Sequence, residues 1–221
     1  DLTNFIKDAG MEILALLVGL FFYKRLNLFA KLLLLQVGIS LINLGLAKVI
    51  SYYDEDSNNQ IAYGFYVLIE SIIIFYAAYK FMPRLHNRGF IYGGLVLILI
   101  RYFFQFILSG IFVLPNYAYC ASSIFLSIVY FYILFNLFIN GKNLENSTSI
   151  KVITVGIIIF FTCLAPYMAM FNYLNEYELS LSRTLYSLIL INFSNLRYLL
   201  YGLGFIIMAR GTFKGRNLKM T

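Results

Sequence analysis

Long runs of apolar residues, separated by short stretches rich in charged and turn residues, recur along the whole chain. Each run holds about 20 residues, the length that an α-helix needs to cross the hydrocarbon core of a bilayer. None of the runs alternates apolar and polar positions as a membrane barrel strand does, so helices are the predicted spanning elements. Seven segments are predicted, at about 5–23, 32–52, 61–79, 89–114, 117–139, 152–172 and 185–208.

The composition agrees with this pattern, since 61% of the 221 residues are hydrophobic and only 12% are charged. Ordinary soluble domains carry about 25% charged residues. No stretch is left for a soluble domain. We therefore predict an all-α fold, a seven-transmembrane-helix bundle that forms a single transmembrane domain over residues 1–221 and ends in a basic tail at 209–221.

Basic residues lie mainly in the loops on one side of a seven-span chain. That side has twelve of the 17 Lys and Arg: Lys24, Arg25, Lys31, Lys80, Arg84, Arg88, Lys142, Lys151, Arg210, Lys214, Arg216 and Lys219. The other side has Lys7, Arg183 and the acidic loop "YDEDSNNQ". Because basic loops stay in the cytoplasm, the N-terminus is predicted outside and the C-terminus inside, most simply in a bacterial inner membrane.

The basic loops on one side account for most of the net charge of +7. Such loops also suit contact with anionic lipid headgroups. No basic domain or stripe is present that could track a nucleic-acid backbone. The lipid bilayer is therefore the predicted partner, and nucleic acid is not.

Charged residues inside the predicted spans are the main candidates for function. Glu70, Arg101 and Arg197 lie near the middle of the third, fourth and seventh spans, and Glu12 lies in the first. Each such charge costs roughly 2.5–3.5 kcal/mol at the bilayer centre, and such residues usually face the bundle interior and pair. We expect a charge-balanced cluster in which Glu70 pairs with Arg101 or Arg197.

Polar residues at helical spacing surround these charges. Tyr66 precedes Glu70 by four residues, Gln105 follows Arg101 by four, and Tyr201 follows Arg197 by four, with Asn195 nearby. Further polar positions lie in the second span (Gln36, Ser40, Asn43) and the fifth span (Ser123, Ser127, Tyr130). Three interpretations fit: a ligand- or ion-binding cavity, buried structural ion pairs, or a proton relay. Pro166 predicts a kink in the sixth helix.

Several chemistries have no support in the sequence. The motifs HExxH and GxSxG are absent, and the single histidine, His86, lies in a basic loop. No catalytic residue, metal site or cofactor is predicted, and the chain is not expected to be an enzyme.

In topology the chain resembles the seven-helix sensor regions that precede bacterial histidine kinases. The stretch "YVLIESIIIFYAAYK" is also similar to the Tyr-rich third helix, with a central Glu, of small uncharacterised membrane proteins of Bacteroidota. Only eleven residues follow "FIIMAR". The resemblance therefore implies output through a separate partner, or through a domain removed from this chain.

The leading interpretation is a membrane bundle that senses a ligand or partner, or serves as an accessory subunit, through its buried charges. It predicts a protein partner or homo-oligomer, and a small-molecule ligand. The first alternative is a small transporter or channel, in which two arginines facing one acid favour an anionic or zwitterionic solute. The second is a structural subunit of a larger membrane complex.

Overall fold

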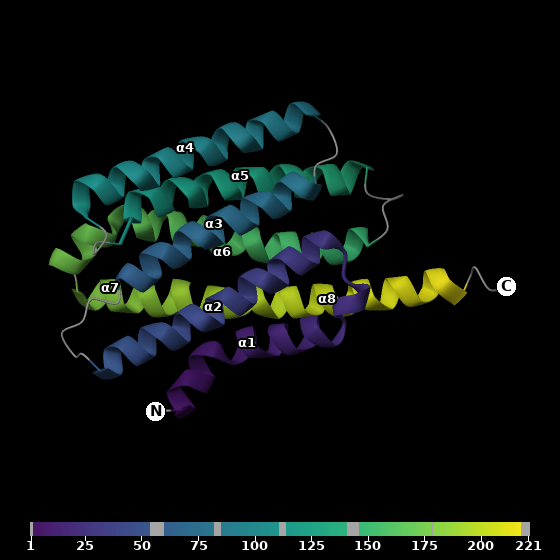
Figure 1. The fold of residues 1–221 in the computed structure, drawn as a ribbon, viewed down its shortest axis with the longest axis horizontal. Coiled ribbons are helices and arrows are strands. Elements are labelled where there is room, and N and C mark those ends of the chain that lie inside the picture. Colours follow the sequence, from purple (N-terminus) through teal and green to yellow (C-terminus); the bar gives the residue numbers. More distant parts are fainter. Residues whose placement is uncertain are drawn as a thin grey trace.

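The described part of the chain is built entirely of helices. The computed structural model describes residues 2–53, 60–81, 85–110, 114–140, 146–177 and 179–217, and no strand occurs among them (Figure 1). The elements are α1 (Leu2–Phe21), the short 3-10 helix η1 (Tyr23–Arg25), α2 (Leu28–Tyr53), α3 (Gln60–Phe81), α4 (Leu85–Ser109), α5 (Asn116–Asn140), α6 (Ser147–Tyr177), α7 (Leu179–Tyr186), the π-helix η3 (Ser187–Phe193) and α8 (Ser194–Asn217). The predicted all-α fold is confirmed.

Parts of the predicted pattern lie outside the described residues. These are residues 111–113 of the fourth predicted span, the loop segments 54–59, 82–84 and 141–145, and residues 218–221 of the predicted basic tail.

Six helices are long and apolar enough to cross a bilayer, so the chain has the build of an integral membrane protein. Their apolar segments are Leu28–Ile50, Ala62–Phe81, Gly89–Leu108, Asn116–Ile139, Ser147–Leu174 and Leu188–Gly211. The apolar part of α1, Ala9–Phe21, is shorter. The seventh span and the orientation therefore stay predictions.

The helices lie side by side along one long axis (Figure 1). α6 and α8 are central: α6 packs against α5 and α8, and α8 packs against α1. α2 contacts α1 and α3, while α4 lies at one edge and contacts only α3 and α5 among the elements with substantial contacts. Figure 1 shows α4 along the top edge of the bundle and α1 along the bottom.

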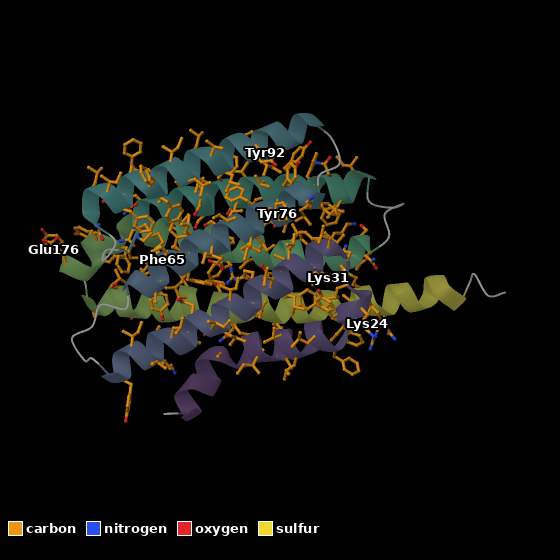
Figure 2. The ribbon with its side chains drawn as sticks, in the orientation of Figure 1. Lys24, Lys31, Phe65, Tyr76, Tyr92 and Glu176 are labelled. Carbon is orange, nitrogen blue, oxygen red and sulfur yellow. The ribbon has the colours of Figure 1, made fainter. Side chains whose placement is uncertain are left out.

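One end of the bundle carries lysines that lie against aromatic rings. The Nζ atoms of Lys31, Lys80 and Lys151 lie 4.7, 5.3 and 4.6 Å from the ring centroids of Tyr23, Tyr76 and Phe138. Amphipathic rings and lysines of this kind are typical of membrane–water interfaces. Figure 2 shows Lys24 and Lys31 toward this end and Glu176 at the opposite end.

Helix ends differ from the predicted ones where backbone geometry intervenes. The fourth helix ends at Ser109, not at residue 114, because Gly110 has a φ of 79° and Pro115 follows. Left-handed glycine is a common helix terminator, and proline discourages continuation. α6 continues through Pro166, whose side chain is exposed. The kink predicted there stays a prediction.

Candidate functional site

Arg197 and Glu70 form a buried ion pair between α8 and α3. Nη1 of Arg197 donates a hydrogen bond to Oε1 of Glu70 over 2.8 Å, and each side chain is 1% exposed. This is one of the two pairings that the sequence favours. A charge pair with this little exposure is stable only if other groups satisfy the remaining polar atoms.

Three further donors surround the Glu70 carboxylate. Nε2 of Gln36 and the hydroxyl of Tyr66 each donate to Oε1 over 2.9 Å, and the hydroxyl of Tyr119 donates to Oε2 over 2.6 Å. Together with Arg197, these donors engage both carboxylate oxygens. An ionised carboxylate accepts hydrogen bonds on both oxygens, so this environment suits charged Glu70.

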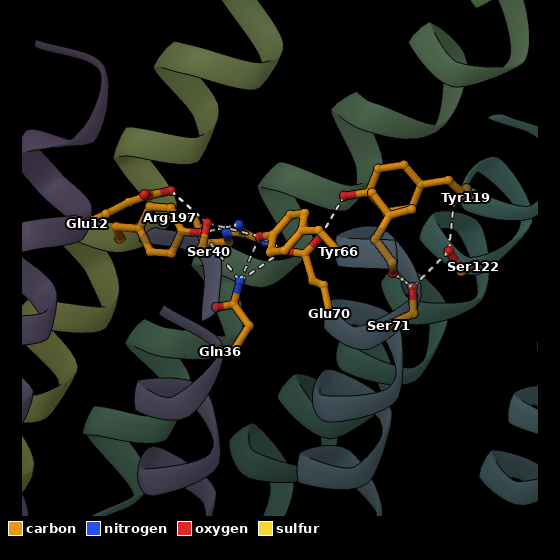
Figure 3. A network of polar contacts seen from close by, with 11 residues as sticks. Glu12, Gln36, Ser40, Tyr66, Glu70, Ser71, Tyr119, Ser122 and Arg197 are labelled. Carbon is orange, nitrogen blue, oxygen red and sulfur yellow. Dashed lines mark hydrogen bonds and ion pairs between the residues drawn. The ribbon is translucent and has the colours of Figure 1, made fainter. Parts of the chain in front are cut away.

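A second set of hydrogen bonds connects Arg197 to Glu12 on α1. Nη2 of Arg197 donates to the Tyr198 hydroxyl over 2.7 Å, Tyr198 donates to Oγ of Ser40 over 3.0 Å, and Ser40 donates to Oε1 of Glu12 over 3.0 Å. Each hydroxyl accepts one bond and donates the next, so the bonds polarise one another in one direction. We call Glu12, Gln36, Ser40, Tyr66, Glu70, Tyr119, Arg197 and Tyr198 the polar network (Figure 3).

Glu12 is the acid in the polar network without a full set of partners. Its side chain is 8% exposed, and Oε2 has no hydrogen-bond partner among the described residues. Glu12 and Glu70 contribute two formal negative charges and Arg197 one positive charge, which leaves the network at −1. Burying an uncompensated carboxylate is costly. Oε1 of Gln36 and Nε of Arg197 also have no hydrogen-bond partner among the described residues. Glu12 is the acid of the network at which a proton, a cation or another donor would supply a missing bond.

Aromatic rings hold the guanidinium group of Arg197. Its Cζ lies 3.9 Å from the ring centroid of Phe160 and 4.7 Å from that of Tyr198. Cation–π contacts of this kind gain strength away from water. Contacts with two rings and hydrogen bonds at Nη1 and Nη2 leave the side chain little freedom.

A cavity of about 380 Å³ adjoins the polar network. Its polar lining includes Glu12, Ser40, Tyr66, Glu70 and Arg197, and its apolar lining includes Val67, Phe160, Met168, Phe171 and Leu190. From Glu70 the lining continues along α3 to Tyr63, toward the end where α2 stops and α3 begins. Small-molecule sites have this size and this combination of apolar walls with a few convergent polar groups.

Local backbone features place Arg197 beside the cavity. A Cβ atom at Gly156 of α6 would lie 3.3 Å from the carbonyl oxygen of Arg197, so the missing side chain lets α6 approach α8. The π-helix η3 ends four residues before Arg197, and its Leu190 and Ile191 line the cavity. π-helical turns are rare and frequently occur at functional sites.

Arg101 lies outside the polar network, contrary to the expected cluster of two acids and two bases. Its side chain is exposed on α4, and no hydrogen bond or ion pair joins it to the described residues. α4 is the edge helix, and this face of it turns away from α3 and α5. Two acids and one arginine occupy the interior, so the cluster carries a net formal charge of −1 instead of being balanced as predicted.

Of the other predicted site residues, one belongs to the polar network and the rest lie outside it. Tyr66 belongs to the network, whereas Oε1 of Gln105 accepts a hydrogen bond from the backbone N–H of Ala118 over 3.0 Å, in the first turn of α5. Gln105 thus satisfies an unpaired helix-end donor. Tyr201 is fully buried against the ring of Tyr198, with centroids 5.8 Å apart, and Asn195 is half-buried. Neither lines the cavity.

Polar residues of the fifth predicted span mostly bond to backbone. Ser123 and Ser127 donate to the carbonyl oxygens of Tyr119 and Ser123 in their own helix, and Tyr130 donates to that of Ile74. The residue of α5 that does reach Glu70 is Tyr119. Its spacing of four residues from Ser123 was an available signal. Phe160, one of many phenylalanines, carried no comparable signal.

No group of three or more His, Cys, Asp or Glu side chains that could hold a metal ion occurs within the described residues. Comparisons of the chain with models of protein families, with curated proteins and with solved structures find no match. Its function is therefore inferred from the site itself.

Proposed function

We propose that this membrane bundle binds a small amphiphile with a cationic or hydrogen-bond-donating head in the cavity, and that it acts as a sensor or accessory subunit. The observation that carries the proposal is Glu12, a buried carboxylate that has one oxygen without a hydrogen-bond partner among the described residues and that lines a largely apolar cavity. A donor group on the ligand would supply the missing bond, and the apolar walls would receive its hydrocarbon part.

The sign of the net formal charge of the polar network determines which class of ligand is favoured. In the transport alternative drawn from the sequence, two arginines facing one acid favour an anionic or zwitterionic solute. With Arg101 on the outer face of α4, Glu12 and Glu70 outnumber Arg197, and Glu70 already has four donors. An anion beside Glu12 would meet uncompensated negative charge, so a cation or neutral donor is favoured.

The hydrogen-bond chain supports a sensing role. Binding at Glu12 would change the acceptor strength of its carboxylate and hence the Ser40–Tyr198–Arg197 chain, which joins α1 to α2 and α8. Beyond the network, Tyr201, Phe205 and Met208 are fully buried in the following turns of α8. This packing favours a one-sided binding site over the transport alternative.

The test uses the protein in nanodiscs of zwitterionic lipid and three probes of equal chain length: hexylammonium, hexanol and hexanoate. We expect hexylammonium to bind most tightly by calorimetry and hexanoate most weakly. Glu12→Gln, which keeps the shape of the side chain, should weaken hexylammonium binding by about tenfold or more, equivalent to about 1.4 kcal/mol. Native mass spectrometry of the protein from its own membrane then identifies any retained molecule.

The matched control is Glu176→Gln, which removes an exposed acid at the end of α6. It should leave binding of all three probes unchanged. Tighter binding of hexanoate than of hexylammonium, or equal binding of hexylammonium to the Glu12→Gln and wild-type proteins, would contradict the proposal.

A further inference from the structure

Arg101 lies within an apolar surface on α4 and not in the bundle interior. The apolar segment of α4 is Gly89–Leu108, and 22% of an apolar 18-residue stretch of it is buried in the bundle, the lowest share among the six candidate spans. Exposed large side chains next to Arg101 on this surface are Leu97, Phe104 and Leu108. No partner for the guanidinium group occurs among the described residues.

Depth makes this exposure costly. Arg101 follows Gly89 by twelve residues and precedes Leu108 by seven, which places it about 18 Å and about 10 Å from the two ends of the apolar segment at 1.5 Å per residue. The nearer end lies toward the helix C-terminus, whereas side chains on a helix lean toward its N-terminus. Snorkelling to the nearer headgroups therefore runs against the direction of the side chain.

The surrounding positions have the spacing of a helix-packing stripe. Phe90, Gly93, Leu97, Arg101, Phe104 and Leu108 follow one another at intervals of three or four residues, and all six are exposed. A Cβ atom at Gly93 would meet no atom within 4 Å. The same holds for Gly89, four residues earlier. Small residues four apart let membrane helices approach closely, and polar side chains then bond across the contact.

A second copy of this chain does not supply the missing anion. Two copies related by a twofold axis along the membrane normal would bring both Arg101 side chains to the same depth, where like charges repel. The six candidate spans contain one acidic residue, Glu70, and the shorter apolar helix contains Glu12. Both are buried in the polar network. No acid on the apolar surface of another copy is therefore available at this depth.

We propose that the exposed stripe of α4 docks a transmembrane helix of a different protein that carries an Asp or Glu opposite Arg101. The carboxylate neutralises the guanidinium group away from water, and Gly93 allows the two backbones to approach. The interaction is independent of the cavity and of its ligand, and it supplies a physical contact for an accessory or signalling subunit.

In the experiment, the photocrosslinking residue p-benzoylphenylalanine replaces Phe104 in the full-length protein within its native membrane. The positional control carries the same residue in place of Leu17, on the exposed side of α1. We expect the Phe104 probe to give one defined protein adduct whose crosslinked transmembrane peptide contains Asp or Glu. Arg101→Gln should lower its yield by about tenfold or more, and Arg210→Gln, at an exposed arginine near the end of α8, should not. Charge exchange, Arg101→Glu with the partner acid changed to Arg, should restore the adduct.

Four results would overturn the proposal: adducts only to lipid, adducts to a second copy of this chain, a partner helix without an acid, or a yield that Arg101→Gln does not change. Folding is checked separately in each variant by its thermal unfolding in detergent. Because Arg101 makes no bond within the described bundle, its loss should leave that unfolding temperature unchanged.

Discussion

Two arginines near the middle of apolar helices have opposite environments in this protein. Arg197 is 1% exposed and contacts Glu70, Tyr198 and Phe160, whereas Arg101 is exposed on an edge helix. The same residue type therefore has two different consequences. One charge stabilises the interior arrangement, and the other requires a group from outside the described bundle.

The ion pair gives the first prediction at this scale. Arg197→Gln and Glu70→Gln should each lower the free energy of unfolding by about 3–5 kcal/mol, because each leaves a buried charge without its partner. The double variant should cost clearly less than the sum of the two. Unfolding in mixed detergent micelles, followed by circular dichroism, measures all three values.

Arg101→Gln is the matched control in that series, since it removes the same kind of charge from an exposed position. Its effect on the isolated protein should stay within about 0.5 kcal/mol, as for other surface changes. Equal losses for Arg101→Gln and Arg197→Gln, or strict additivity in the double variant, would mean that the ion pair is not the source of the stability.

Sequence patterns predicted which charges lie in helices, but not which way the helices face. Arg101 and Arg197 both have polar residues four positions later, so their local patterns are equivalent. The difference arises from packing: Ile91, Ile98 and Tyr102 form the buried side of α4, and Arg101 lies beyond the edge of that side, where it is exposed. The rotation of a helix about its own axis depends on contacts between distant segments. The periodicity of a single helix does not predict these contacts.

At the scale of elements, glycines decide how closely helices pack. A Cβ atom at Gly94 would collide with the ring of Phe125, which is itself held between the rings of Phe75 and Phe90 with centroids 5.5 and 4.9 Å away. A ring enclosed on two sides has little room to move. The contact between α4 and α5 therefore depends on the missing side chain.

Gly94→Ala should lower the free energy of unfolding by about 1–3 kcal/mol, the usual cost of overpacking. Gly93→Ala, one position earlier and in open space, should keep or slightly raise the stability, because alanine favours helix over glycine. Chemical unfolding of the two variants side by side checks this difference. A loss at Gly93 as large as at Gly94 would contradict the assignment of the loss to the Phe125 contact.

Element positions were predictable because apolar runs must be helical within a bilayer. Two irregularities were not. The left-handed backbone at Gly110 shortens α4, and the π-helical hydrogen bonding of η3 occurs in "SLILINF", whose composition is that of an ordinary apolar helix. Backbone irregularities of this kind reflect local packing, and apolar runs of the same composition form regular helices elsewhere in the chain.

At the scale of the whole molecule, the distribution of charge predicts the direction of the bundle in the membrane. Lys24 and Lys31 lie near the end opposite to that of Glu176, on the side where twelve Lys and Arg are predicted to gather (Figure 2). The cavity continues from the polar network toward the other end. If the basic end is cytoplasmic, the cavity faces the outer side of the membrane and would bind molecules from that side.

Topology reporters test this arrangement together with the seventh span. A green fluorescent protein fused after Thr221 should fluoresce, because it folds in the cytoplasm, and a cysteine placed before Asp1 should react with a membrane-impermeant maleimide in intact cells. Both results together require an odd number of spans, which makes α1 a spanning helix. Labelling of the N-terminal cysteine only after cell lysis would place both termini inside and leave six spans. Glu12 would then belong to a helix that does not cross the membrane. A ligand would have to reach its unpartnered oxygen from the lipid interface.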